Sequence, residues 1–212
     1  MEKEKFRFYF LWISAICITA FIIQVVFPVF TELFLLNKKS IDNFEIYRFI
    51  TAIFLHGSLI HLMLNLFALL FFGAILEKKI GSKKFILIYF FSGIFANLIS
   101  VFFYKASLGA SGAIYGILGA LIVIEPFMMV FSFGIMMPMF LAGFLWIIAN
   151  ILEGIGVIGN TNTENIAHLS GIAIGIILSF LILKKNFKNS FKKNQNILSE
   201  EEFQKWENKY LN

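Results

Sequence analysis

Charged residues are scarce in this sequence, and their scarcity excludes an ordinary soluble domain. Only 15% of the 212 residues are charged and 59% are hydrophobic, whereas a soluble domain is about a quarter charged and about half apolar. Cysteine is almost absent: Cys17 stands alone, so one chain forms no internal disulfide. We interpret Cys17 as a small apolar core residue. The composition predicts a membrane protein.

Six apolar stretches are long enough to cross a hydrocarbon core about 30 Å thick. They cover residues 8–30, 59–76, 85–104, 112–129, 133–152 and 166–183. We expect helices, because in lipid each backbone polar group must be satisfied within its own segment. Strands of a barrel would alternate in polarity, and these stretches do not. The sequence therefore predicts an all-α membrane protein, a bundle of six transmembrane helices.

Basic residues cluster where we expect the cytoplasm, because short loops rich in Lys and Arg stay on that side. The clusters precede the first span and follow the second and the sixth, at Lys3, Lys5 and Arg7, at Lys78, Lys79, Lys83 and Lys84, and at Lys184, Lys185, Lys188, Lys192 and Lys193. We predict a multi-pass protein of a cell membrane with both termini cytoplasmic and the first span as an uncleaved anchor. Nucleic acid is not an expected partner, because no soluble basic face with interleaved aromatics is present.

The chain is predicted to form one transmembrane domain, residues 1–183, followed by a cytoplasmic tail, residues 184–212. Within the tail, Ser199 and Glu202 have the spacing of a capping box. Phe203, Trp206 and Tyr210 then fall on one helical face. We expect a short amphipathic helix that lies on the inner leaflet or docks on the bundle. A solvated tail is the alternative.

Polar side chains within the spans are candidates for function, because each is costly in hydrocarbon. His61 and Asn65 lie four residues apart in the second span, so they share one helix face and can donate to a common point. The alternative is a hydrogen-bond clamp between helices that has no chemical role.

Small residues form stripes along the fourth and sixth spans, and each stripe begins at a reactive side chain. The first follows Ser111 with Gly112, Gly116 and Gly119, and the second follows His168 with Gly171 and Gly175. Such stripes let helix backbones approach closely, and they can be packing seams and nothing more. Close approach is also what an imidazole needs to take the proton of a serine on another helix. We therefore expect Ser111 to contact His168, and Tyr115, one turn further on, to stack on the imidazole.

The negative charge of an attacked carbonyl needs donors nearby, and the start of a helix at Ser111 offers free backbone N–H groups. His61 and Asn65 could complete this oxyanion hole.

The residues that other classes of protease require are missing from the sequence. The only aspartate, Asp42, lies outside the spans, which excludes an aspartyl dyad. No His-Glu-x-x-His is present, and Ala113 departs from the nucleophile elbow Gly-x-Ser-x-Gly. We expect no metal and no cofactor.

Several motifs occur together between Arg48 and Leu183, and with them the sequence resembles the rhomboid family of intramembrane serine proteases. They are His56 with His61 and Asn65, Gly73 and Glu77 before Lys-Lys-Ile-Gly-Ser-Lys, Gly109-Ala110-Ser111-Gly112 with Tyr115, and Ala167-His168-Leu169-Ser170-Gly171 with Gly175. The resemblance implies Ser111 as nucleophile, His168 as general base and then acid, and an oxyanion hole of His61, Asn65 and the Ser111 amide. It implies supporting roles for Gly109, Gly112, Tyr115, His56 and Gly171. Arg48 matches the arginine of the family's Trp-Arg pair, and Tyr47 replaces the tryptophan.

The resemblance also implies a fold and a substrate. Residues 106–110 would form a re-entrant loop before the fourth helix, at the bottom of a water-filled cavity. Substrates would be single-span membrane proteins whose helix unwinds near the outer face. Two alternatives are a rhomboid-like pseudoprotease that binds membrane proteins without cleaving them, and a small channel or transporter lined by His61, Asn65 and Glu125.

Overall fold

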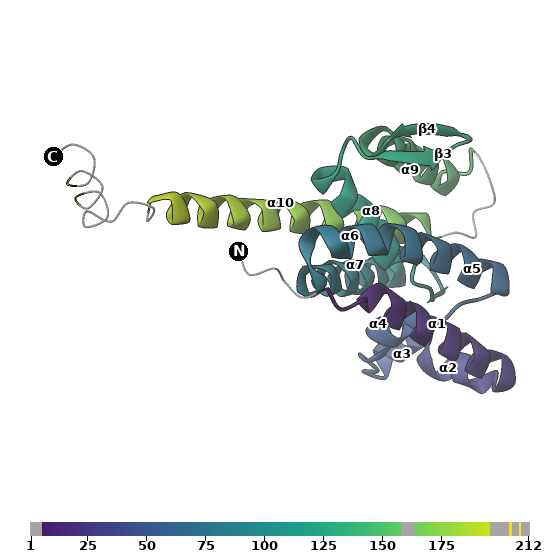
Figure 1. Ribbon diagram of the computed structural model, residues 1–212. Coiled ribbons are helices and arrows are strands. Elements are labelled where there is room, and N and C mark those ends of the chain that lie inside the picture. The colour runs from purple at the N-terminus through teal and green to yellow at the C-terminus, as the bar shows by residue number, and fades with distance from the viewer. Residues whose placement is uncertain (1–5, 158–163, 196–203, 205–207, 209–212) are drawn as a thin grey trace. The chain divides into compact units, whose positions relative to one another are not determined.

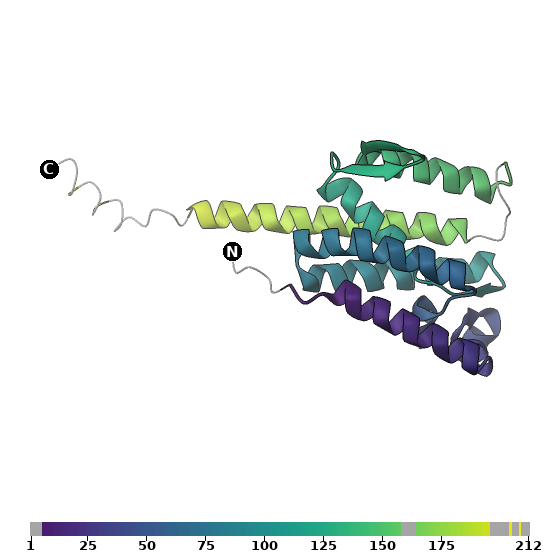
Figure 2. The same cartoon turned by 45° about the vertical axis from the view of Figure 1, so that its right-hand side comes forward.

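A computed structural model describes residues 6–157, 164–195, 204 and 208 of the chain. The chain divides into two compact units, Met1–Leu178 and Ser179–Asn212, and most of the helices belong to the first (Figures 1 and 2). The domain boundary predicted at residue 183 stays a prediction. So does the amphipathic helix of the tail, because Phe203, Trp206 and Tyr210 lie outside the described residues.

Helices make up most of the described chain (Figure 1). In chain order they are α1 (Tyr9–Val26), α2 (Val29–Phe34), α3 (Lys38–Asp42), α4 (Arg48–Thr51), η1 (Ala52–Phe54), α5 (Leu59–Ala68), η2 (Leu69–Gly73), α6 (Ala74–Ile80), α7 (Ser82–Phe103), α8 (Ser111–Ile124), α9 (Met139–Gly154) and α10 (Asn165–Gln195). Four short strands in the described ranges form two antiparallel pairs: β1 (Leu36–Asn37) with β2 (Ala106–Ser107), and β3 (Met129–Ser132) with β4 (Ile135–Pro138).

Among the residues that the structure describes, four helical segments are long and apolar enough to cross a membrane: α1, the continuous run Leu59–Ile80, α7, and Asn165–Lys184 of α10. The helices α8 and α9 are apolar but shorter. The prediction of a helical membrane bundle is confirmed. The run Leu59–Ile80 consists of α5, η2 and α6, and η2 is a π-helical turn, a feature that often occurs near functional sites.

The predicted bounds of the fourth and fifth spans, 112–129 and 133–152, are wrong between residues 125 and 138. There α8 has ended and the hairpin β3–β4 precedes α9, with Met129 paired to Pro138 and Ser132 to Ile135. Proline explains the end of α8, because Pro126 disfavours a helical conformation at Glu125. Phe133 and Gly134 both have positive φ, as a two-residue hairpin turn requires.

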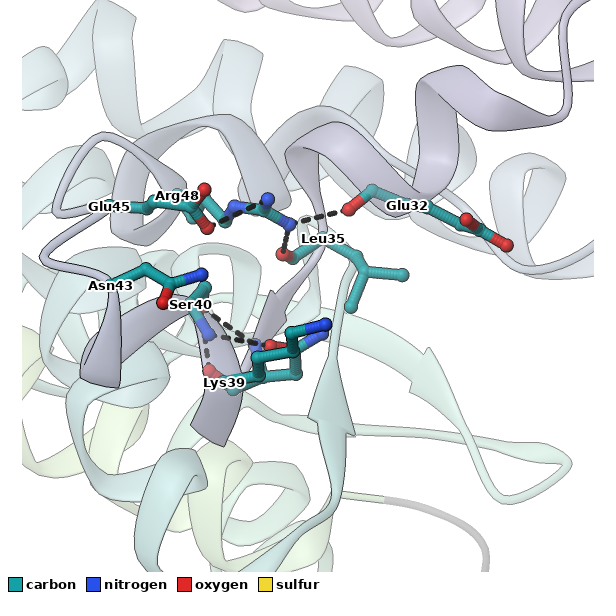
Figure 3. Close-up of a pocket in the computed structure, with 8 residues that line it drawn as sticks. Glu32, Leu35, Lys39, Ser40, Asn43, Glu45 and Arg48 are labelled. Carbon is teal, nitrogen blue, oxygen red and sulfur yellow. Dashed lines mark hydrogen bonds and ion pairs between the residues drawn. The ribbon is translucent and has the colours of Figure 1, made fainter.

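Arg48 organises the connection between α1 and α5 (Figure 3). Its guanidinium is buried; Nη1 donates to the backbone oxygens of Glu32 and Leu35 at 2.5 and 3.0 Å, and Nη2 forms a 2.8 Å ion pair with Glu45. Through these contacts of Nη1 and Nη2, Arg48 fixes the chain on either side of β1. Strand β1 pairs with β2 in the segment that leads into α8. The predicted re-entrant loop, residues 106–110, thus begins as a strand.

Candidate active site

Ser111 and His168 meet where α8 and α10 begin. Ser111 is the first residue of α8, and His168 lies in the first turn of α10. Ser111 Oγ and His168 Nε2 are 2.9 Å apart, a hydrogen-bond distance. The structure thus brings together the two side chains selected from the sequence.

Glycine seams hold the two helices at this distance. A Cβ added to Gly171 would overlap the carbonyl oxygen of Gly112, and one added to Gly175 would overlap that of Gly116. A Cβ on Gly119 would lie 3.0 Å from the Cα of Ile172. The backbones of α8 and α10 therefore touch over two helical turns below the Ser111–His168 contact, and a side chain at these positions would separate them.

Tyr115 and Asn150 surround the other side of the His168 ring. The phenol ring of Tyr115 stacks on the imidazole, with centroids 4.3 Å apart and an interplanar angle of 18°. Asn150, from α9, places its Oδ1 3.1 Å from His168 Nδ1. Sequence reasoning missed Asn150. The available signal was the one that selected Asn65, an asparagine within an apolar span.

His61 reaches the site from α5, across Gly109. A Cβ on Gly109 would lie 3.0 Å from His61 Nε2 and 3.8 Å from Ser111 Oγ, so the ring and the hydroxyl border the same small space. Gly109 also has φ +126°, a conformation that side chains rarely adopt. Asn65 is buried on the next turn of α5, where its Nδ2 donates to the His61 carbonyl at 2.8 Å. This bond uses one of the two N–H groups of the Asn65 amide.

His56 is buried in the loop before α5 and supports His61 from behind. The two imidazoles pack edge to face with centroids 5.1 Å apart. Gln24 of α1 fixes the loop, because its Oε1 accepts from the His56 backbone N–H at 3.0 Å and its Nε2 donates to the His56 carbonyl at 3.3 Å. Burial lowers the pKa of His56 to about 4, and the nearby His61 adds to the shift. His56 is therefore neutral at physiological pH.

Glu164 joins three segments around the site, and sequence reasoning did not select it. Its Oε2 accepts from the hydroxyls of Ser107, before α8, and Ser100, in α7, at 2.6 and 3.1 Å. Its backbone carbonyl accepts from the His168 N–H at 3.0 Å. Burial raises the pKa of the Glu164 carboxyl, and the two hydroxyl donors oppose the shift. Glu164 thus ties the approach to Ser111 to α7 through its carboxyl group and contacts the first turn of α10 through its backbone carbonyl.

The structure is thus a bundle of apolar helices in which a serine hydroxyl lies within hydrogen-bond distance of a histidine ring. The rhomboid domain model matches residues 43–185, which includes both side chains. The chain belongs to the rhomboid family, and it is a multi-pass membrane protein.

Three relatives illustrate the range of the family. The chain is 34% identical over 161 residues to "RHOMBOID-like protein 6, mitochondrial" of Arabidopsis thaliana, covering 72% of this chain and 51% of that protein. It is 30% identical over 148 residues to rhomboid protease GlpG of Yersinia pseudotuberculosis, 67% and 50% of the two chains. It is 37% identical over 87 residues to "Inactive RHOMBOID-like protein 8" of Arabidopsis thaliana, 40% and 25%. The chain spans about half or less of the length of the first curated relatives that it matches.

Proposed function

We propose that this protein is an intramembrane serine endopeptidase in which Ser111 is the nucleophile and His168 the general base. The 2.9 Å contact between Ser111 Oγ and His168 Nε2 is the observation that carries the proposal. Relatedness to a rhomboid protease supports the same reading.

The chemistry follows from the position of each atom. As Ser111 Oγ attacks the carbonyl carbon of the scissile bond, His168 Nε2 takes the hydroxyl proton and then delivers it to the leaving amine. The same nitrogen next takes a proton from a water molecule that hydrolyses the acyl-enzyme and returns it to Ser111 Oγ. In both tetrahedral intermediates the oxyanion would accept from the Ser111 backbone N–H at the start of α8, together with His61 and Asn65.

Membrane proteins that reach this site within the bilayer are the proposed substrates, in particular single-span proteins cleaved near the outer face. A helix that can unwind there is required, because an intact helix uses its carbonyl groups in its own hydrogen bonds. The basic clusters of the sequence favour an orientation with both termini in the cytoplasm. The domain of residues 1–183 would then act with residues 184–212 as a cytoplasmic tail.

The second candidate function is binding of membrane proteins without cleavage. The similarity to an inactive relative favours it. Such a protein would use the same bundle, and its serine and histidine would serve only packing.

Reconstitution separates the two candidates. The protein, Ser111→Ala and His168→Ala are each inserted into liposomes with a model single-span substrate, and fragments are followed over time. We expect cleavage by the unchanged protein and by neither variant. Equal processing by all three proteins would overturn the assignment of Ser111 and His168. Retained substrate binding without cleavage by the unchanged protein would favour the binding function.

A further inference from the structure

Asn150 is a buried amide whose orientation is fixed by its neighbours. The residue is 5% exposed. Its Nδ2 donates to the backbone carbonyl of Trp146 at 2.9 Å and to the Tyr115 hydroxyl oxygen at 3.3 Å. A backbone carbonyl only accepts, so the nitrogen of the amide must face Trp146. Asn150 Oδ1 therefore faces His168 Nδ1.

The orientation of Asn150 determines which nitrogen of His168 carries the proton. An amide oxygen only accepts, so Nδ1 must be the donor across the 3.1 Å contact. A neutral imidazole has one N–H, and Nε2 is then left with its lone pair toward Ser111 Oγ. This tautomer is the one that a general base needs.

We propose that Asn150 is a positioning residue that extends the Ser111–His168 pair into a hydrogen-bonded chain and holds His168 in the tautomer and ring orientation that accept the serine proton. This inference rests on the proposed protease function. The proton on Nδ1 stays there throughout the reaction, and only Nε2 gains and loses one. When Nε2 is protonated, the Asn150 oxygen stabilises the imidazolium as a neutral dipole, which avoids burying a second charge in the bundle.

Tyr115 contacts both His168 and Asn150. Its ring stacks on the face of His168 while its hydroxyl accepts from Asn150, so the imidazole is held both in its plane and over its face. Asn150 comes from α9 and Tyr115 from α8. The base on α10 is therefore oriented by two neighbouring helices.

The test compares three variants of the full-length protein in liposomes. Asn150→Leu keeps the size of the side chain and removes the acceptor, Asn150→Ala removes both, and Asn150→Asp keeps an oxygen at Oδ1. We expect Asn150→Leu and Asn150→Ala to lower kcat by about tenfold to a hundredfold with KM little changed, the range found for residues that orient metal-bound histidines. Asn150→Asp should lose less of kcat than Asn150→Leu, because it keeps an acceptor for His168 Nδ1, although its second oxygen replaces the N–H that faces the Trp146 carbonyl. The proposal would be overturned if Asn150→Asp and Asn150→Leu lost kcat equally while both unfolded at the same temperature as the unchanged protein.

Nitrogen-15 NMR of labelled histidine gives a readout that does not depend on cleavage. In the unchanged protein at neutral pH, His168 should show a protonated Nδ1 and an unprotonated Nε2, with His168→Ala identifying the signals. In Asn150→Leu the tautomer preference should weaken. A protonated Nε2 in the unchanged protein would overturn the proposal even if no variant folds. Absence of cleavage together with the expected tautomer would instead count against the protease function alone.

Discussion

Gly175→Ala tests whether the close contact of α8 and α10 sets the geometry of the site. A Cβ at residue 175 would lie 2.8 Å from the carbonyl carbon of Gly116 and 2.9 Å from its Cα, and closer still to the oxygen. Carbon atoms in contact prefer about 3.5 Å or more, so the two helices must part by roughly 1 Å. Packed backbones cannot absorb this by a change of rotamer.

The separation should reach Ser111 and His168, two turns away. A Ser111 Oγ to His168 Nε2 distance of 2.9 Å would grow to about 3.9 Å, beyond hydrogen-bond range. Misplacement of reacting groups by about 1 Å costs about a hundredfold in rate. We therefore expect Gly175→Ala to lower kcat/KM by about a hundredfold, and overpacking to lower the free energy of unfolding by about 1–3 kcal/mol.

Cleavage of a single-span substrate in liposomes measures the rate, and thermal unfolding in micelles measures the stability. Gly154→Ala is the matched control, because a Cβ at residue 154 meets only the Asn165 Cβ at 3.6 Å, an ordinary contact. We expect this control to behave like the unchanged protein. A Gly175→Ala variant with undiminished rate and an unaltered unfolding temperature would refute the reasoning.

Three further predictions concern buried titratable side chains. The pKa of His56 is about 4 in the folded protein, below its ordinary 6.5, so the unfolded state binds the proton first as pH falls. The free energy of unfolding should therefore drop by about 3 kcal/mol between these two pH values. Unfolding curves of His56→Gln should lack this drop. Burial raises the pKa of the Glu164 carboxyl. The unfolded state then loses the proton first as pH rises, so the free energy of unfolding falls as pH rises through the raised pKa. The melting temperature of Glu164→Gln should show no such fall. The Glu77 carboxylate accepts from the backbone N–H groups of Tyr9 and Phe10 at 3.1 Å each. Glu77→Gln should therefore lower the free energy of unfolding by about 1–3 kcal/mol in denaturant titrations. An unchanged denaturation midpoint would show that the start of α1 needs no carboxylate.

Composition and small-residue patterns were enough to predict much of this molecule. The lipid environment restricts an apolar stretch to a helix, which is why α1 and α7 lie close to their predicted bounds. The glycines of α8 and α10 likewise indicated which helices touch, and Ser111 and His168 stand at the ends of those stripes.

The hairpin β3–β4 and the partners of His168 required tertiary information. Residues 125–138 are mostly apolar, and periodicity does not separate a strand from a helix in such a run. Asn150 is one polar residue in α9, and its sequence neighbours do not tell which helix it faces. The rotation of α9 about its axis decides that, and packing against α8 sets the rotation.

The pairing of β1 with β2 links the connection after α1 to the segment that leads to Ser111. In the described part of the chain this pairing consists of Leu36 with Ser107 and Asn37 with Ala106. The second segment leads directly to Ser111, the proposed nucleophile. A residue inserted or deleted between α1 and α4 would shift this register and displace residues 106–110, which lead to Ser111. If the proposed cleavage takes place at Ser111, the length of this connection would influence its rate, although no residue of the connection touches the reacting groups.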